Sequence, residues 1–304
     1  MNHEQDPKNS ADDGDARESD EFHFQVCVLR MSSVTVLFTS HNRIEKTREC
    51  VYSLDDTGLD MRYFVVDDGC TDGTAEMLQR FAAEKQRKIE IIEGNGNLYW
   101  AGGMRAGMEA LLAKEDRTDY LLMVNDDVVF EDRAVLRMIE TERSDPGSCI
   151  CGATCDQEGR RTHGGSVYEM GKVSRRRLYI DDPDLWCEVA DMNAFLMPFE
   201  VFRKTGGFDP HYSHSMADYD YCFMLKGRGV SILMTPYYVG RCEGNDIDGT
   251  WRDVSLPRME RVRIKESSKG LPAREWFYFL KKNFGLKKAI WHSITPYLRI
   301  LARL

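Results

Sequence analysis

The stretch Tyr120-Leu-Leu-Met-Val-Asn-Asp-Asp-Val128 decides the fold. Its first five residues are continuously apolar, which is typical of a strand that helices cover on both faces of a parallel sheet. The strand ends in two adjacent aspartates, Asp126 and Asp127, and carboxylate oxygens are the ligands that Mg²⁺ and Mn²⁺ prefer. An Asp-Asp pair after a strand also occurs as a plain turn or helix cap, so its meaning depends on the rest of the chain.

Strand and helix patterns alternate upstream of this stretch. Runs of β-branched and apolar residues predict strands, and apolar residues at helical spacing between them predict helices. This alternation predicts an α/β fold with a doubly wound, mostly parallel sheet, in which ligands bind beyond the carboxyl ends of the strands. The expected elements are strands over 34–38, 62–66 and 89–92, and helices over 44–54, 74–85 and 102–113.

A second acidic cluster, Asp67-Asp68-Gly69, follows the strand over 62–66. In a parallel sheet it would share one crevice with Asp126 and Asp127, where Asp68 could accept hydrogen bonds from a base or ribose. Two acidic strand ends repel each other unless a cation lies between them. The pair therefore favours a metal-plus-nucleotide site over two independent capped turns.

A third acidic element lies at the start of a helix expected over about 217–226, after an irregular stretch that begins near Ser148. Asp218 and Asp220 are two residues apart there. A group transfer by single displacement needs a general base that removes the proton from the acceptor hydroxyl, and Asp218 is our candidate. The alternative is that Asp218 caps the helix and that Asp220 interacts with the helix dipole.

Composition narrows the classes of function. The formal net charge of −9 over 304 residues argues against a general nucleic-acid binder. The nine cysteines include no recurring CxxC pair, which argues against a zinc site and fits buried thiols in a reducing compartment. No run reaches the roughly 18 apolar residues of a membrane span, and no secretory signal is visible, so a cytoplasmic location is expected.

The segment 276–304 is basic and carries an apolar set of residues. It could lie in an anionic membrane interface, as peripheral contact at the inner face of the membrane, or it could pack on the core as a helix with a solvated basic edge. Pro296 is expected to interrupt any single long helix in this region.

Five segments in order resemble the inverting, GT-A-fold glycosyltransferase family 2, particularly its bacterial rhamnosyltransferase-like members. The resemblance covers about 33–241. The segments are Thr39-Ser-His-Asn-Arg43, Val65-Val-Asp-Asp-Gly-Cys-Thr-Asp-Gly-Thr74, Asn97-Leu-Tyr-Trp-Ala-Gly-Gly-Met104, Asn125-Asp-Asp127, and Gly206-Gly-Phe-Asp209 followed by Ala217-Asp-Tyr-Asp220.

The resemblance assigns roles by motif. It implies that the donor nucleotide is lined by Thr39, His41, Asn42 and Arg43, that Asp68 contacts the base, and that Asp218 is the catalytic base. Asp126 and Asp127 stand at the family's DxD-type position, where Asp127 would bind Mn²⁺ or Mg²⁺ and Asp126 would contact metal and donor. The weaker assignments to sugar or acceptor are Asp191, Asn193, His214 and Asp220.

Two features stay open at this stage. Trp100, in the Tyr99-Trp100 pair, could form an aromatic wall with close backbone approach of Gly103 to the donor, or the segment could be a turn packed by core aromatics. Some relatives supply a later histidine to the metal, but the segment Gly240-Arg-Cys-Glu-Gly-Asn245 offers Cys242 or Glu243 and no histidine, so the third ligand is undecided.

The predicted activity is metal-dependent, inverting transfer of a sugar from a UDP-, dTDP- or GDP-linked donor to a glycan or polyprenyl-linked acceptor, in polysaccharide or cell-wall synthesis. One alternative is a noncatalytic nucleotide-sugar-binding or scaffold subunit. The other is a sugar-nucleotide nucleotidyltransferase, which needs a glycine-rich loop that 39–43 lacks.

The sequence also predicts how the chain is divided into domains. We expect an acidic disordered tail or extension (1–30), a glycosyltransferase domain (31–245, with halves 31–147 and 148–245) and a basic amphipathic helical region (246–304).

Overall fold

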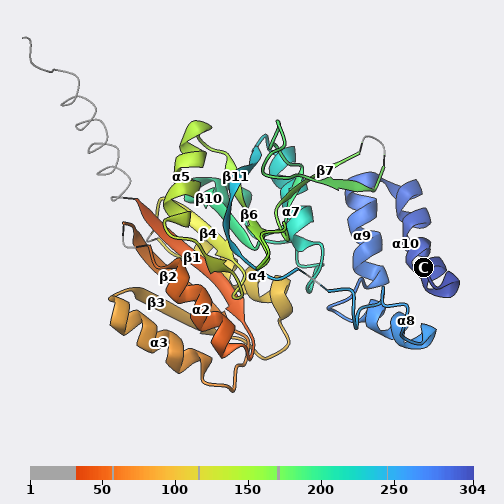
Figure 1. The fold of residues 1–304 in the computed structure, drawn as a ribbon, viewed down its shortest axis with the longest axis horizontal. Coiled ribbons are helices and arrows are strands. Elements are labelled where there is room, and N and C mark those ends of the chain that lie inside the picture. Colours follow the sequence, from red (N-terminus) through yellow and green to blue (C-terminus); the bar gives the residue numbers. More distant parts are fainter. Residues whose placement is uncertain (1–31, 57, 116, 170–171, 245) are drawn as a thin grey trace, which may run out of the picture.

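The computed structural model describes residues 32–304 except 57, 116, 170, 171 and 245, so the tail predicted over 1–30 lies outside the described residues. An eight-stranded sheet forms its centre (Figure 1). The first four strands in spatial order are parallel, and β10 and β5 run antiparallel to their neighbours. In spatial order the strands are β3 (Lys88–Glu93), β2 (Asp60–Asp67), β1 (Ser33–Ser40), β4 (Tyr120–Val124), β10 (Ala194–Pro198), β6 (Cys149–Cys155), β11 (Ile232–Arg241) and β5 (Val129–Phe130).

Helices cover both faces of this sheet, because its strands are apolar on both sides. In β1, Val34, Val36 and Phe38 face one buried cluster, and Leu37 faces the other. The first cluster is closed by α2 (Ile44–Leu54), α3 (Thr74–Lys85) and α5 (Ala134–Ser144), and the second by α4 (Tyr99–Leu112), α6 (Phe199–Thr205) and α7 (Ala217–Gly227). The predicted doubly wound α/β sheet is confirmed.

A three-stranded antiparallel sheet and three helices complete the fold. The small sheet comprises β8 (Arg175–Arg177), β7 (Gly165–Tyr168) and β9 (Val189–Ala190). The helices α8 (Arg258–Glu266), α9 (Ala273–Phe284) and α10 (Leu286–Ala302) stand beside α7, at the end of the molecule far from β3 (Figure 1). Phe279 and Leu280 of α9 belong to the same buried cluster as α4 and α7, so these helices share the core of the main sheet.

The expectation that Pro296 interrupts a long helix is wrong. The helix α10 continues through Pro296, which is buried. Proline cannot donate to the carbonyl of the residue four positions earlier, here His292. The indole N–H of Trp276 donates to that carbonyl oxygen at 3.0 Å, and the Thr295 hydroxyl donates to it as well. The carbonyl left unpaired by proline is thus satisfied from α9.

One edge of the main sheet collects the carboxyl ends of six strands, β1, β2, β3, β4, β6 and β11. The order 3-2-1-4 means that the chain reverses its direction of travel between β1 and β4, which creates a crevice at that point. Because β6 and β11 run in the same direction as β4, their carboxyl ends reach the same edge, and the antiparallel β10 begins there. Residues that follow β1, β2, β4 and β11 and precede β10 therefore meet.

Candidate functional site

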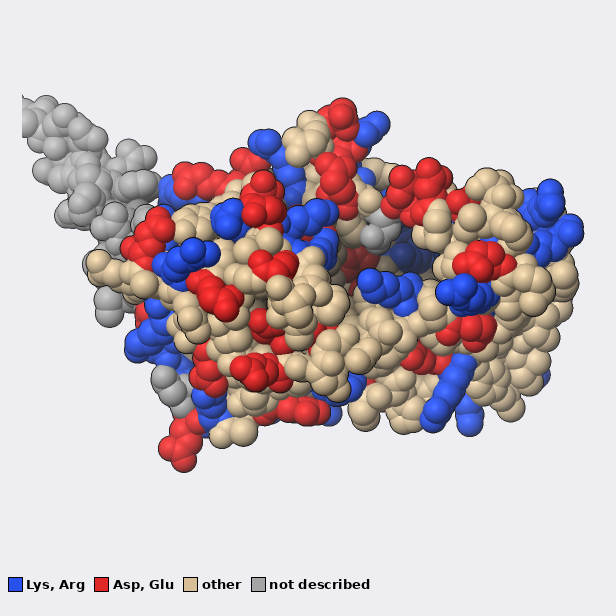
Figure 2. All heavy atoms as spheres, turned by 90° about the horizontal axis from the view of Figure 1, so that it is seen from below, with Lys and Arg blue, Asp and Glu red and all other residues tan. Residues whose placement is uncertain are grey.

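A cavity of about 940 Å³ opens at this edge, between the sheet, the start of α4, the start of α7 and the loop between α8 and α9. Figure 2 shows a hollow in this side of the molecule, with charged side chains of both signs around it. Most of the residues singled out from the sequence line the cavity. These are Thr39, His41, Arg43, Asp68, Trp100, Asp126, Asp127, Asp191, Asn193, His214 and Asp218.

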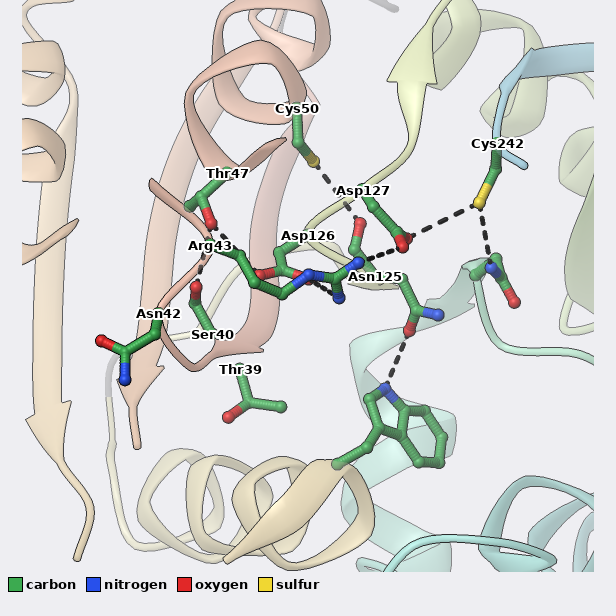
Figure 3. Close-up of polar contacts among 12 residues, drawn as sticks. Thr39, Ser40, Asn42, Arg43, Thr47, Cys50, Asn125, Asp126, Asp127 and Cys242 are labelled. Atoms are coloured by element: carbon green, nitrogen blue, oxygen red, sulfur yellow. Dashed lines mark hydrogen bonds and ion pairs between the residues drawn. The ribbon is translucent and has the colours of Figure 1, made fainter. Parts of the chain in front are cut away.

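The two aspartates after β4 are bridged by Arg43, which follows β1 (Figure 3). Its Nη1 lies 2.9 Å from Asp126 Oδ1, and its Nη2 lies 2.5 Å from Asp127 Oδ2. The side chain of Asp126 is 4 % exposed and also accepts a hydrogen bond from Thr47, whereas that of Asp127 is 22 % exposed. Burial raises the pKa of Asp126 although Arg43 opposes the shift. Asp127 is therefore the carboxylate that a ligand can reach.

Cys242 lies on the other side of Asp127 (Figure 3). It follows β11, and its thiol lies 3.6 Å from Asp127 Oδ1. The Asn193 side-chain amide contacts the same sulfur. Among the described residues, no group of three or more His, Cys, Asp or Glu side chains is arranged to hold a metal ion. Protein side chains alone thus supply two adjacent carboxylates, and any further oxygen ligands would have to come from a bound molecule or water.

The carboxylate of Asp68 organises the loop before α4. One oxygen accepts a hydrogen bond from the Gly96 N–H at 2.8 Å, and the other accepts from the N–H groups of Leu98 and Tyr99 at 2.9 and 3.2 Å. Asp68 is 3 % exposed. The expected contact between Asp68 and a base stays a prediction. In the structure, its carboxylate accepts hydrogen bonds from three backbone N–H groups and so fixes the shape of the cavity wall.

The loop held by Asp68 places Trp100 in the cavity wall. The indole N–H of Trp100 donates to the Asn125 side-chain oxygen at 2.8 Å, which ties the loop to the end of β4. The backbone N–H of Trp100 lies 3.4 Å from His214 Nδ1. Burial and the charge of Lys269 lower the pKa of His214. A neutral imidazole that accepts at Nδ1 leaves Nε2–H as its donor.

Gly103, which was predicted to allow close approach of the donor, does not line the cavity. It lies inside α4 against Thr39: a Cβ at this position would be 2.3 Å from Thr39 Oγ1 and 2.8 Å from Thr39 Cβ. The close approach is between helix and strand, and it positions Thr39, which does line the cavity.

We expect Gly103→Ala to lower the free energy of unfolding by about 1–3 kcal/mol, since the added methyl overpacks this contact. The matched control is Gly227→Ala in α7, where a Cβ would meet no atom within 4 Å. That change should be neutral or stabilising, because alanine favours a helix over glycine. Urea unfolding of both variants checks the difference. Equal effects at the two positions would show that the contact with Thr39 carries no strain.

Asn42 also lies outside the cavity lining. It is exposed, with a positive φ of 51°, and its side-chain oxygen accepts a hydrogen bond from the Thr71 N–H at 2.7 Å. Asn42 therefore joins the loops that follow β1 and β2, and its contact with the nucleotide stays a prediction.

Asp218 faces the cavity from the first turn of α7. Burial, with the nearby charge of Asp191, raises its pKa to about 7. Its Oδ1 accepts a hydrogen bond from the Tyr219 N–H at 2.9 Å, and its surroundings include Arg175. A carboxylate with a pKa near neutrality can accept and release a proton under physiological conditions.

A polar network that the sequence did not reveal lies beside Asp218. The Tyr219 hydroxyl donates to Asp191 Oδ1 at 2.5 Å, and Arg175 lies over the Tyr219 ring with 4.4 Å to its centroid. His163 Nδ1 is 3.8 Å from the other oxygen of Asp191. The three consecutive arginines at 175–177 are visible in the sequence as a basic run. The contact of Arg175 with Tyr219 of α7, however, depends on the small sheet, whose sequence has no periodic pattern.

Asp220, which was predicted to contact sugar or acceptor, lies outside the cavity lining. It is 3 % exposed, and its two oxygens accept hydrogen bonds from Lys282 Nζ at 2.7 Å and from the Asn283 amide at 2.9 Å. Lys282 also pairs with Asp209. Asp220 thus joins α7 to the end of α9.

The loop between α8 and α9 brings Ser267, Ser268 and Lys269 to the cavity. The Ser215 hydroxyl donates to the Gly270 carbonyl at 3.0 Å, and the Ser213 hydroxyl donates to Glu275 at 2.7 Å. These bonds attach the C-terminal helices to the segment before α7. The sequence analysis assigned no site residue to this loop.

A family model described as glycosyl transferase family 2 matches residues 35–206. One curated relative, the succinoglycan biosynthesis protein ExoA of Rhizobium meliloti (strain 1021), is 25 % identical over 205 residues. That match covers 63 % of this chain and 55 % of the relative, so it spans about half of the relative's length.

Two solved structures share the fold at low identity. A mannosyltransferase, PcManGT from Pyrobaculum calidifontis in complex with GDP-Man and Mn²⁺, has a TM-score of 0.56 at 12 % identity, over 94 % of this chain and 84 % of that chain. GalNAc-T7 with UDP, GalNAc and Mn²⁺ has a TM-score of 0.56 at 11 % identity, over 88 % of this chain and 54 % of that chain. The predicted GT-A type of fold is confirmed by these similarities.

Proposed function

Since this chain belongs to glycosyl transferase family 2, we propose that it transfers a hexosyl group from a nucleotide-sugar donor to a glycan or polyprenyl-linked acceptor, with inversion at the anomeric carbon. The observation that carries the proposal is that one cavity is lined by a pair of adjacent aspartates and, separately, by an aspartate whose pKa is raised to about 7. Asp126 and Asp127 line it from the end of β4, and Asp218 lines it from the start of α7.

The carboxylates after β4 suit a divalent metal. Asp127 is accessible from the cavity, and hard oxygen ligands match Mn²⁺ and Mg²⁺. Such ions are commonly held by one or two carboxylates together with substrate phosphates, which fits a site with only two adjacent carboxylates. We propose that Asp127 and Asp126 hold the metal. When bound, it would offset the negative charge of the departing diphosphate.

Arg43 has a defined part in this proposal. Its guanidinium pairs with both carboxylates in the structure, so it must release or share Asp127 when a cation and a donor enter. A guanidinium also binds phosphate well through paired N–H groups. We propose that Arg43 then turns toward the donor diphosphate, in keeping with its predicted place beside the nucleotide.

Asp218 is the proposed general base. It accepts the proton of the acceptor hydroxyl while that oxygen forms a bond to the anomeric carbon of the donor sugar. The bond between the anomeric carbon and the diphosphate oxygen breaks, and the nucleoside diphosphate leaves with the bonding electrons. The pKa of Asp218, raised to about 7 by burial, makes it a stronger base than an exposed carboxylate.

The remaining assignments follow from this scheme. We propose that residues 31–147 form the nucleotide-sugar half and 148–245 the acceptor half, where Asp191, His163 and Arg175 line the cavity. The naming of one relative as a succinoglycan biosynthesis protein supports a role in polysaccharide synthesis. The UDP-, dTDP- or GDP-linked identity of the donor, rhamnosyltransferase-like specificity and action at the cytoplasmic face of a membrane are part of the proposal.

The first test is thermal unfolding with a panel of UDP-, dTDP- and GDP-sugars, with and without Mn²⁺. We expect one nucleotide class to raise Tm by about 5 °C at a concentration near 100 times its Kd, since ligands that bind the folded state stabilise it. The free nucleoside without phosphates is the matched control and should have little effect. If no donor shifts Tm with or without metal, the proposed donor site is wrong.

A further inference from the structure

The exposed face of α10 is the strongest feature that the proposed transfer reaction does not use. Fifteen large apolar side chains are exposed among the described residues, and seven of them lie within the last 19 residues of the chain. Trp291 is 63 % exposed and Leu301 is 62 % exposed. The seven are Leu286, Ile290, Trp291, Ile294, Leu298, Leu301 and Leu304.

The spacing of these residues places them on one side of the helix. With about 3.6 residues per turn, positions 286, 290, 294, 298 and 301 follow one another along a single stripe, and 291 widens it. The buried residues of α10, Ala289, Pro296 and Ile300, fall on the neighbouring side, which packs on α8 and α9. A soluble monomer rarely exposes so many large apolar side chains in one patch.

The charges carried by the segment that contains this stripe are all positive. From Trp276 to Leu304 the chain contains no Asp or Glu and six Lys or Arg residues. Lys282 is paired with Asp209 and Asp220, whereas Lys281, Lys287, Arg299 and Arg303 are exposed at the surface. In Figure 2 this end of the molecule has a broad uncharged area, with basic side chains and some acidic ones around it. An apolar stripe beside basic side chains matches a helix that lies in the interface of an anionic membrane.

The basic side chains also extend toward the cavity. Burial lowers the pKa of Arg252, and the charges of Arg299 on α10 and of Arg175 in the cavity wall lower it further. The loop with Ser268 and Lys269 reaches the cavity from the same group of C-terminal helices. A surface that contacted α10 would therefore lie beside the cavity mouth.

We infer that the apolar stripe of α10 docks on an anionic phospholipid surface, with Trp291 and the leucines and isoleucines in the acyl boundary and the lysines and arginines at the phosphates. A second copy of the chain is a less suitable occupant, since pairing two such helices would bring like charges together. The inference rests on this surface alone and does not depend on the proposed transfer reaction.

The test is co-sedimentation of the full chain with vesicles of equal parts phosphatidylglycerol and phosphatidylcholine, and with vesicles of phosphatidylcholine alone. The wild type should bind the anionic vesicles more tightly, and added salt should weaken that binding. The double variant Trp291→Ser with Ile294→Ser should lose at least about tenfold in vesicle affinity, because it removes two large apolar groups from the stripe.

The matched control is Trp186→Ser with Ile247→Ser, two equally bulky exposed residues outside the stripe. It should bind vesicles as the wild type does, and circular dichroism should show both double variants folded. Light scattering after size exclusion follows the oligomeric state. Three results would overturn the inference: no binding of the wild type to anionic vesicles, equal binding by the two double variants, or a wild-type dimer that the stripe variant dissociates.

Discussion

Asp218→Asn is expected to lower the rate of sugar transfer by about 10³-fold while donor-induced thermal stabilisation stays close to that of the wild type. Asparagine keeps the size of the side chain and its acceptor oxygen for the Tyr219 N–H, but it cannot take a proton from the acceptor hydroxyl. The measurement is release of nucleoside diphosphate from the donor that stabilises the wild type, with and without acceptor.

The pH dependence tests the same residue independently. With the pKa of Asp218 raised to about 7 by burial and by Asp191, the base is protonated below that pH. The wild-type kcat/KM should therefore rise about tenfold per pH unit up to pH 7 and level off above it, as expected for a single essential base. The residual activity of Asp218→Asn should lack this dependence.

The shifted pKa also affects stability. The folded state binds the Asp218 proton more tightly than the unfolded state, where an aspartate has a pKa of about 3.9. This contribution is fully present below pH 4 and is lost as the pH rises through about 7. Asp218→Asn should therefore raise Tm relative to the wild type more at pH 8 than at pH 5.

Asp220→Asn is the matched control for Asp218→Asn. Asp220 lies two residues away in the same helix but outside the cavity, paired with Lys282 and Asn283. We expect this change to lower Tm and to leave transfer within a few-fold of the wild type below the unfolding transition. If Asp218→Asn instead keeps transfer within tenfold, Asp218 is structural. If the wild type binds donor but transfers no sugar, the result would support the alternative that the chain is a noncatalytic nucleotide-sugar-binding or scaffold subunit.

The regular part of the fold was predictable because its signals are local. The helices over 44–54 and 74–85 and the strand over 120–124 have the predicted bounds, since each is set by apolar spacing and by a nearby turn residue. Parallel strands gather their carboxyl ends at one edge, so the meeting of His41, Asp68 and Asp127 followed from strand order alone.

The remaining part of the site depends on contacts between distant segments. The bridge from Arg43 to Asp126 joins residues 83 positions apart, and no local pattern indicates it. The placement of His163 and Lys269 in the cavity follows from the small sheet and from the loop after α8, both without periodicity. The carboxylate of Asp68 was predicted at the right edge, but its three backbone donors come from a loop whose shape depends on glycine and on a positive φ at Tyr99.

Asp127→Ala is expected to abolish the part of donor stabilisation that requires Mn²⁺ and to lower transfer by roughly 10²-fold or more, since loss of even an outer-shell partner of a metal costs 10–100-fold. Asp127 is the accessible member of the pair, whereas Asp126 is buried and held by Thr47 and Arg43. The folded structure should tolerate the change, because Arg43 keeps its bond to Asp126. Thermal unfolding with donor, across a Mn²⁺ titration, measures the metal-dependent shift in Tm.

The matched control for Asp127→Ala is Glu243→Gln, which removes a different carboxylate from the lining of the same cavity. If Mn²⁺ acts at Asp127, only Asp127→Ala loses the metal-dependent shift, and Glu243→Gln responds as the wild type does. If both variants lose it to the same degree, the cation is attracted by the general negative charge of the cavity rather than held at the end of β4. If neither variant loses it, the metal site after β4 is wrong, and the bridge from Arg43 to Asp126 and Asp127 is a permanent part of the fold.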